Sequence, residues 1–203
     1  MTFRYEGPTF QTRTSSPSTT SHAAYAASIK PIRPRDGSPA VWTALLLFNR
    51  WMGGDAKSLP WAETYGKSRS VVAGEGGELS FAEIEIVKRL RGAGWEGGWL
   101  DTFGAAPVRW RPWMVTLHAM PSNVRTRYYE IHTAANRAQG KNGTGGRPDV
   151  IAWRERSIVF LESKGPGDRI KPAQEAWASC AVESDHDGYG VVYWTFRAES
   201  GTP

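Results

Sequence analysis

The amino-acid sequence predicts an α/β fold in which helices cover both faces of a β-sheet. Two short apolar runs, residues 150–153 and 158–161, have the length and composition of strands, and the few residues between them predict a β-hairpin. Each run is apolar on both of its faces, which is typical of strands enclosed between two helical layers. One face carries Ile151, Trp153, Ile158 and Phe160, and the other carries Val150, Ala152, Val159 and Leu161.

The register of this hairpin gathers three charged side chains. A tight turn at Glu155-Arg156 sets Asp149 opposite Glu162, and cross-strand partners share one face of the sheet. Lys164 lies on the same face as Glu162, because side chains along a strand return to one face at every second residue. Two carboxylates and an ammonium group are therefore expected to converge where the hairpin opens.

Two interpretations of this trio are open. Divalent cations such as Mg²⁺ prefer oxygen ligands, often one or two carboxylates with water and a substrate phosphate. A metal ion held there can activate water at a phosphodiester, and a neighbouring lysine can orient that water or stabilise the developing charge. Alternatively, the three side chains form a partly buried ion-pair network. The short pattern by itself favours neither interpretation.

Residues 79–91 predict a helix, with Ser80 as its N-cap. At about 100° per residue, Glu83 falls in the middle of the apolar face, whereas Glu85 falls on the solvated side. The apolar face is formed by Ala82, Ile86, Val87 and Leu90. An acidic side chain in a core-facing stripe is costly unless it has a partner or a metal. Glu83 is therefore a candidate site residue, and the alternative is a glutamate that reaches around to solvent.

The remaining elements are predicted from apolar runs and turn residues. They are a helix at about 40–52, a strand at 95–101, an irregular insertion at about 103–145 with a helix near 123–139, a helix at about 172–183, and a final strand at 190–196.

The residues around the trio carry a longer pattern. It consists of Pro148-Asp149, then Glu162-x-Lys164-Gly165-Pro166, then Asp168, and finally Gln174-x-x-Trp177. This pattern resembles the PD-(D/E)XK nuclease superfamily and, within it, the virus-type replication-repair nuclease (VRR-NUC) family. The resemblance is close over residues 146–177 and looser back to about residue 80.

The resemblance implies a restriction-endonuclease-like, three-layer αβα core with a mixed central sheet, and a metal-dependent DNA nuclease. It implies that Asp149 and Glu162 hold one or two Mg²⁺ or Mn²⁺ ions, helped by the Ser163 carbonyl. Glu83 is expected to supply the helix carboxylate of the superfamily, with Glu85 as the alternative. Lys164 would position or activate the water.

The resemblance also places Gln174 at the edge of the site, at the start of the helix that Pro172 opens. It implies structured, branched or flapped DNA as the substrate, in repair, replication or phage DNA metabolism. Some small relatives act as dimers, so a homodimer is one expected state. Two other functions stay open: a restriction or defence endonuclease with sequence readout, and a non-catalytic nucleic-acid-binding scaffold. The scaffold would be marked by loss of a catalytic residue, and the sequence shows no such loss.

Composition adds a weaker argument for a polyanionic partner. The 203 residues carry a net charge of +5. Residues 1–40 contain five Lys or Arg against two Asp or Glu, so most of the excess lies there and the rest of the chain is nearly balanced. Basicity therefore supports nucleic-acid binding only mildly.

The chain is predicted to consist of a tail and one domain. Residues 1–38 are rich in Ser and Thr, which predicts a flexible basic tail that either is a solvated leader or lies along DNA; the leader is preferred. Residues 39–203 are expected to form the nuclease-like domain. The single cysteine, Cys180, fits a reducing compartment, and no secretory signal or membrane span is visible, so a cytoplasmic location is expected.

Overall fold

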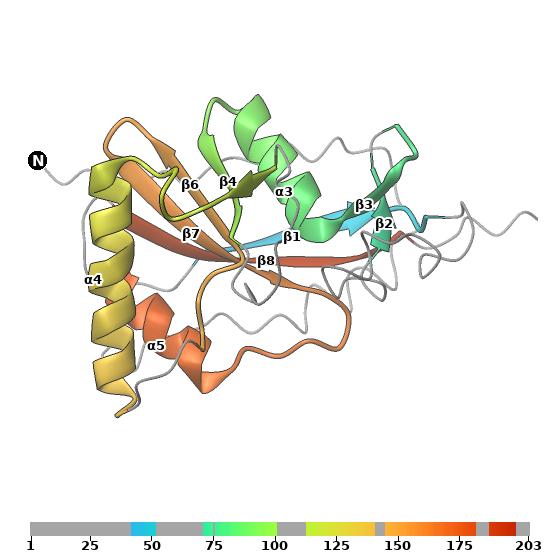
Figure 1. Cartoon of the computed structure of the whole chain (residues 1–203). Coiled ribbons are helices and arrows are strands. Elements are labelled where there is room, and N and C mark those ends of the chain that lie inside the picture. Colours follow the sequence, from blue (N-terminus) through green and yellow to red (C-terminus); the bar gives the residue numbers. More distant parts are fainter. Residues whose placement is uncertain are drawn as a thin grey trace, which may run out of the picture.

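A six-stranded mixed sheet forms the centre of the protein in a computed structural model, which describes residues 42–51, 71–74, 76–100, 113–140, 145–181 and 187–197. The strands lie in the order β1-β8-β7-β6-β4-β5 (Figure 1). Their bounds are Trp42–Phe48 for β1, Glu96–Leu100 for β4, Met114–Val115 for β5, Val150–Arg154 for β6, Ser157–Lys164 for β7 and Asp187–Phe196 for β8. A separate two-stranded sheet pairs β2, Val71–Ala73, with β3, Leu79–Phe81.

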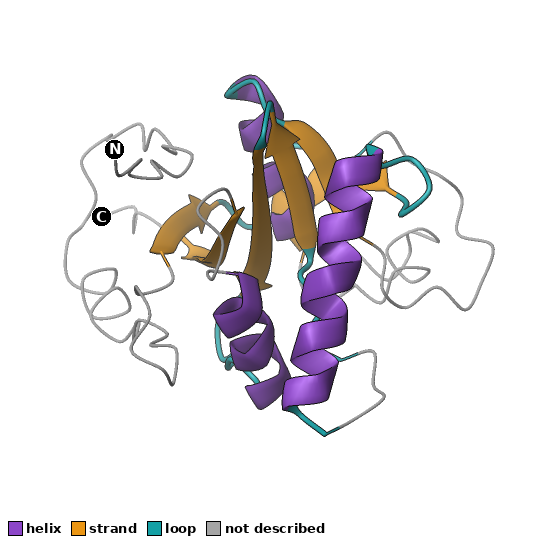
Figure 2. Cartoon of the chain, turned by 90° about the vertical axis from the view of Figure 1, so that its left-hand side faces the viewer, coloured by secondary structure: helices purple, strands orange, loops and turns teal. Residues whose placement is uncertain are grey.

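Helices cover both faces of the central sheet. Helix α3, Ala82–Gly92, packs on one face, and helices α4, Ser122–Ala138, and α5, Pro172–Ala181, pack together on the other (Figure 2). The core on the α3 side includes Ile86, Leu90, Val159 and Leu161, and the core on the α4–α5 side includes Ile131, Ile158, Phe160 and Trp177. The predicted α/β fold with a mixed central sheet is confirmed, and it is consistent with a restriction-endonuclease-like core.

The hairpin of β6 and β7 has the predicted register and the predicted faces. Arg154 pairs with Ser157 and Val150 pairs with Leu161, so the next position outward sets Asp149 across from Glu162. Glu155 adopts a positive φ of 54° in the two-residue turn, as tight hairpin turns require. Ile151, Ile158 and Phe160 lie in the α4–α5 core, whereas Val150, Ala152, Val159 and Leu161 lie in the α3 core.

The helix predicted at about 40–52 is wrong, because residues 42–48 form strand β1. This strand pairs in parallel with β8, from Trp42 opposite Gly190 to Phe48 opposite Phe196. A short apolar run fits a buried helix and a buried strand equally well by periodicity. The deciding factor is a partner strand near the other end of the chain, which local sequence does not reveal.

Ser80 is not the N-cap of the helix that follows it. Helix α3 begins at Ala82, its N-cap residue is Phe81, and no side chain caps it. Ser80 lies in β3, because pairing with β2 keeps the chain extended through Phe81. The other predicted elements are found as β4, α4, α5 and β8, each within a few residues of its expected bounds.

Several predictions fall on residues outside the described ranges. These include the tail at 1–38 and, within the insertion predicted at about 103–145, residues 103–112 and 141–144. The boundaries of the tail and the domain therefore stay predictions. Helix α4 lies inside that insertion, and it buries Val124, Tyr128, Ile131 and Ala135 against the core.

Candidate active site

The open end of the β6–β7 hairpin brings Asp149, Glu162 and Lys164 together, as the sequence predicts. The Lys164 Nζ atom donates a hydrogen bond of 2.7 Å to Glu162 Oε1, and both side chains are buried. Asp149 accepts a 2.8 Å hydrogen bond from the backbone N–H of Ser163 at its Oδ2 atom. Its own carbonyl accepts from the backbone N–H of Leu100, so β4 also fixes the backbone of Asp149.

Gln174 reaches the same group from the first turn of α5. Its Oε1 atom accepts a 2.9 Å hydrogen bond from the backbone N–H of Lys171, and its Nε2 atom donates a short hydrogen bond to Glu162 Oε1. The first bond is half of a capping box, in which a side chain three residues into the helix satisfies a backbone N–H at the helix start. Because the amide oxygen is engaged there, the amide nitrogen must face Glu162.

Gly146 allows the segment before Asp149 to approach α5. It has a φ of +81°, and a Cβ atom added to it would lie 2.2 Å from the carbonyl oxygen of Ala173. Only glycine combines this conformation with such a close backbone approach. The contact holds the Asp149 segment against the helix that carries Gln174.

The Lys164-Gly165 step is also set by packing. A Cβ atom on Gly165 would lie 2.5 Å from Cζ2 of Trp194, so the chain leaves β7 across the face of that ring. Asp168 accepts a 2.9 Å hydrogen bond from the backbone N–H of Gly165 and thereby closes the loop after β7. Asp168 is thus a loop-stabilising residue in this structure.

Burial dominates the electrostatics of Glu162. Glu162 is only 3 % exposed. Its burial, and after that the nearby charge of Asp149, raise the pKa of its carboxyl group well above the usual value. The charge of Lys164 lowers this pKa, but by less. Its Oε2 atom is buried and has no hydrogen-bond partner among the described residues. A buried carboxylate oxygen without a partner is costly, so this atom is suited to bind a proton or a cation.

The oxygen atoms of this site fit a divalent cation. Asp149 and Glu162 supply two carboxylates, and the backbone carbonyl of Ser163 lies between Glu162 and Lys164 in the chain. Mg²⁺ is commonly held by one or two carboxylates plus water and substrate oxygens. Within the described ranges, no three His, Cys, Asp or Glu side chains form a metal-binding group, so the protein would contribute a sparse ligand set.

The two glutamates of α3 have different surroundings from those expected. Glu83 is 6 % exposed, which agrees with its predicted place on the core-facing side, and its role as a site carboxylate stays a prediction. Glu85 was expected on the solvated side but is only 2 % exposed.

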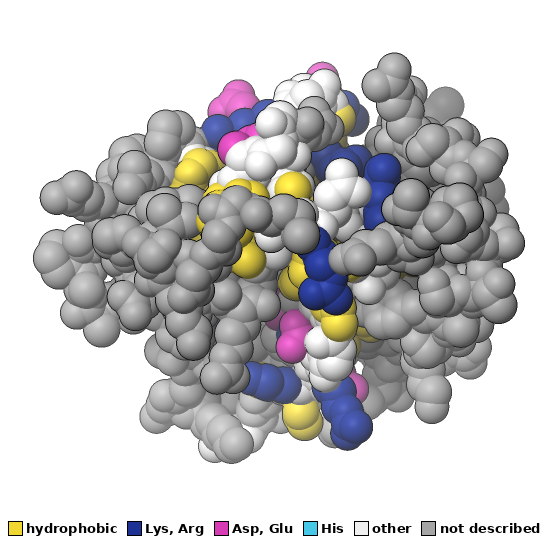
Figure 3. All heavy atoms as spheres, turned by 90° about the vertical axis from the view of Figure 1, so that its right-hand side faces the viewer, with side chains coloured by type: hydrophobic (Ala, Val, Ile, Leu, Met, Phe, Trp, Pro, Cys, Tyr) yellow, Lys and Arg dark blue, Asp and Glu magenta, His cyan; other side chains and the backbone are white. Residues whose placement is uncertain are grey.

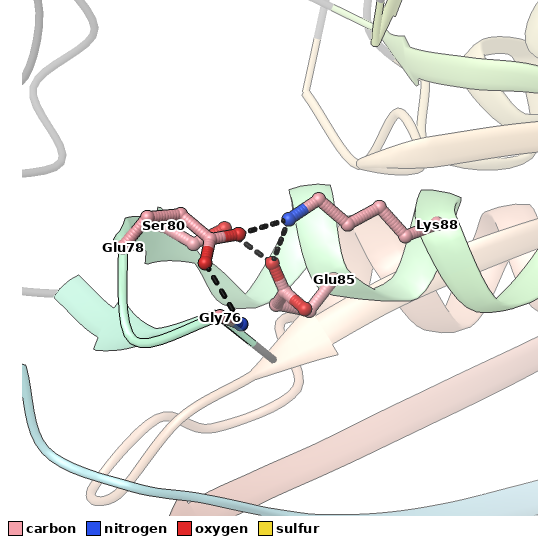
Figure 4. A network of polar contacts seen from close by, with 5 residues as sticks. All are labelled: Gly76, Glu78, Ser80, Glu85 and Lys88. Atoms are coloured by element: carbon pink, nitrogen blue, oxygen red, sulfur yellow. Dashed lines mark hydrogen bonds and ion pairs between the residues drawn. The ribbon is translucent and has the colours of Figure 1, made fainter.

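The burial of Glu85 results from the β2–β3 hairpin, which folds over the start of α3 (Figure 4). Its Oε1 atom accepts a 2.6 Å hydrogen bond from Ser80 Oγ and a 2.8 Å bond from Lys88 Nζ. Lys88 Nζ also donates to Glu78 Oε1 at 2.7 Å. A helical projection considers only the helix itself, so it could not predict that the β2–β3 hairpin buries Glu85. Glu85 is a structural partner of Ser80 and Lys88.

Tyr189 is a residue near the site that the sequence argument missed. It lies on β8 opposite Phe160, on the sheet face that also carries Glu162. The side chain is fully buried, and its hydroxyl has no hydrogen-bond partner among the described residues. Burial first, and then the charges of Glu162 and Asp149, raise the pKa of Tyr189 well above its usual value. Its place beside Glu162 depends on the pairing of β8 with β7, for which the local sequence contains no signal.

The mixed sheet, the helices on both faces and the acid–acid–lysine group at a hairpin end define a restriction-endonuclease-like α/β protein. Residues 126–189 match the VRR-NUC domain, a segment that contains Asp149, Glu162, Lys164 and Gln174. The family predicted from the sequence is therefore confirmed over this segment, about a third of the chain. A VRR-NUC domain is a nuclease domain, which implies DNA as the substrate class.

No curated protein matches the chain. Across the part of the chain that the structure describes, no helix is both long and apolar enough to span a membrane.

The close approach at Gly146 leads to a stability prediction with a matched control. Gly167 has a nearly identical φ of +84°, but no atom lies within 4 Å of the position of an added Cβ. Gly167→Ala should therefore lower the free energy of unfolding by only about 1–2 kcal/mol, the cost of a left-handed alanine. Gly146→Ala should lower it further, because the methyl group also overlaps the Ala173 carbonyl. Urea unfolding of both variants would measure the difference, and equal losses would contradict this account.

The raised pKa of Glu162 predicts how stability depends on pH in the metal-free protein. A carboxyl group whose folded-state pKa lies above its unfolded value of about 4.3 stabilises the fold below that pH, and this contribution is lost as the pH rises through the folded-state pKa. Glu162→Gln is neutral at every pH and lacks this loss. In EDTA, the variant should therefore gain stability relative to the wild type as the pH rises from about 4 towards neutrality. If the difference in the free energy of unfolding between the two proteins does not change with pH, Glu162 does not have a raised pKa in the folded protein.

Proposed function

We propose that this protein is a metal-dependent DNA nuclease that hydrolyses phosphodiester bonds with Mg²⁺ or Mn²⁺. The observation that carries the proposal is the convergence of the half-buried Asp149 with the buried Glu162, Lys164 and Gln174. The VRR-NUC match over the same residues supports a nuclease, and the donor set supports a hard divalent cation.

Asp149, Glu162 and the Ser163 carbonyl would hold the metal, with Glu83 as a further ligand. A bound Mg²⁺ or Mn²⁺ ion supplies Lewis-acid chemistry and lowers the pKa of a bound water. Glu162 can ligate through Oε2, because Lys164 and Gln174 already engage Oε1. Asp149 keeps the backbone of Ser163 in place through its hydrogen bond to the Ser163 N–H.

Lys164 and Gln174 would complete the chemistry. Glu162 holds the Lys164 ammonium group at the site, where it can orient the attacking water and stabilise negative charge on the phosphorus oxygens. Gln174 prevents rotation of the Glu162 carboxylate, because its own amide is fixed by the Lys171 backbone. These two contacts preorganise the carboxylate before the metal and the substrate bind.

Structured or branched DNA is the proposed substrate, in repair, replication or phage DNA metabolism. Arg169 and Lys171 are exposed in the loop that leads into α5, next to Gln174, and they can contact phosphates on one side of the site. A cytoplasmic location and a homodimer, which some small relatives form, complete the proposal.

Two other functions predict different results when the protein is incubated with plain duplex DNA and with branched or flapped DNA. A restriction or defence endonuclease would produce discrete fragments from plain duplex DNA, whereas the proposed enzyme would prefer branched or flapped DNA. A non-catalytic scaffold would bind DNA and cut none. The scaffold is disfavoured by the retained trio, because a binding protein has no use for a buried, partly unsatisfied carboxylate.

Cleavage is expected to require Mg²⁺ or Mn²⁺ and to stop in EDTA. Ca²⁺ should block or weaken it, because its looser coordination misplaces the attacking water. Time courses on labelled branched DNA with each cation would measure this. Undiminished cleavage by pure protein in EDTA would exclude the mechanism.

Asp149→Asn and Lys164→Met separate catalysis from structure. Each keeps the approximate side-chain size and removes one charge, so each should lower turnover by at least ~10²-fold, the scale of a lost transition-state contact. Stability should change little, because Glu162 can take up a proton when Lys164 is removed and repulsion falls when Asp149 is neutralised. Cleavage rates and thermal melts on the same samples would test both expectations.

The control for these variants is Glu130→Gln, which removes one charge from an exposed ion pair with Arg127 on α4. It should keep full activity. If the trio is only a buried ion-pair network, the Asp149 and Lys164 variants should instead lose about 3–5 kcal/mol of stability. Folded and fully active Asp149 and Lys164 variants would also defeat the proposal.

A further inference from the structure

Strands β1 and β8 continue past the end of β7, next to the active site. The pairing of β7 with β8 ends at Lys164 opposite Tyr193, whereas the pairing of β8 with β1 continues to Phe196 opposite Phe48 (Figure 1). We call residues 48–50 and 194–197 the strand extension. This end of the molecule faces the viewer in Figure 3, which shows Lys and Arg side chains spread across it and an acidic side chain recessed among them.

The strand extension is in direct contact with the catalytic strand. Gly165, the residue after Lys164, lies against the ring of Trp194. Trp194 in turn contacts Phe48, at 6.1 Å between ring centroids, and Phe196, at 5.7 Å. The aromatic rings therefore form a continuous apolar base that leads from Gly165 to the end of the extension.

Two exposed arginines lie just after the ends of strands β1 and β8. The guanidinium carbon of Arg50 lies 4.5 Å from the centroid of the Phe196 ring, a cation–π contact that holds the charged group in place. Neither Arg50 nor Arg197 pairs with a carboxylate of a described residue. Their charges are thus available to an external anion.

The backbone beneath these arginines is held by hydrogen bonds. The Arg197 N–H donates to the Phe48 carbonyl at 2.8 Å, and the Ala73 N–H donates to the Asn49 carbonyl at 2.9 Å. The Arg50 guanidinium, which lies on a fixed backbone and against a ring, loses little conformational entropy on binding, and this favours it as a phosphate contact.

We propose that Arg50 and Arg197 bind backbone phosphates of a duplex arm of the DNA substrate, about four nucleotides from the scissile bond. This inference rests on the proposed nuclease function. Arg197 lies four residues beyond Tyr193, the partner of Lys164, which is about 13 Å along an extended strand. Phosphates of one DNA strand are spaced about 3.4 Å along the helix axis, so this span covers about four of them.

The opposite end of the sheet supplies a matched control. Arg154, at the β6–β7 turn, lies 4.9 Å from the centroid of the Trp95 ring and is also exposed. Arg154→Ala therefore removes the same charge from the same kind of cation–π contact as Arg50→Ala, but far from the open end of the hairpin. Both changes alter the net charge equally, so a difference in DNA affinity between the two variants results from the position of the arginine.

The test measures DNA affinity in the Asp149→Asn background, which keeps the DNA intact. Arg50→Ala and Arg197→Ala should each weaken the binding of a branched duplex about tenfold, the size expected for one charge-assisted contact. Each should also lower the slope of log affinity against log salt by roughly 0.9. Arg154→Ala should change neither quantity, and melting temperatures would verify that all variants are folded.

Neutral methylphosphonate groups placed singly along the arm locate the contact. A substitution about four nucleotides from the cleavage point should weaken binding of the protein that carries Arg197, and it should have no further effect on Arg197→Ala. Phe196→Leu, which removes the ring but keeps the charge, should give a smaller loss than Arg50→Ala.

Two outcomes separate this inference from the proposed function. If Arg50→Ala and Arg197→Ala bind DNA as tightly as Arg154→Ala with the same salt dependence, while wild-type protein still cuts DNA, the phosphate contact is wrong and the nuclease stands. If the wild-type protein neither binds nor cuts DNA with Mg²⁺ or Mn²⁺, the proposed function fails and this inference fails with it.

Discussion

The rest of the site depends on the two hydrogen bonds that Lys164 and Gln174 donate to the same atom, Oε1 of Glu162. A carboxylate in the interior is tolerated only when hydrogen bonds or opposite charge compensate for the loss of water. Here Lys164 supplies both from the same strand, and Gln174 supplies a second hydrogen bond from α5. The bond to Gln174 joins the sheet to the helical layer. This site hydrogen bond therefore also connects the central sheet to the helical layer that contains α5.

Contacts from several other elements stabilise this connection between the sheet and α5. Gly146 brings the Asp149 segment against Ala173 of α5, and Leu100 of β4 binds the Asp149 carbonyl. Trp177, one turn after Gln174, is completely buried against Tyr128 and Phe160 and anchors the helix to the sheet. These contacts fix the carboxylates within the fold itself, which under the proposed function lowers the entropy lost when a metal and DNA bind.

The two ends of the sheet have different roles. At one end, the β6–β7 turn closes the hairpin with Arg154 stacked on Trp95. At the other, the hairpin opens at the trio, and β1 and β8 extend beyond it with Arg50 and Arg197. Under the proposed function, the turn end serves stability and the open end faces the DNA, since loops and strand ends carry binding groups on a rigid support.

The sequence by itself determined the hairpin, its register and the convergence of Asp149, Glu162 and Lys164, because two-residue periodicity and turn position are local properties. It also placed Gln174 near the trio and Glu83 on the buried side of its helix. Only the tertiary structure decided that residues 42–48 form a strand, that Glu85 is buried beneath β2 and β3, and that Tyr189 lies beside the acidic pair. Each of these depends on a partner distant in sequence or on cover from another element, and helical or strand periodicity contains no information about either.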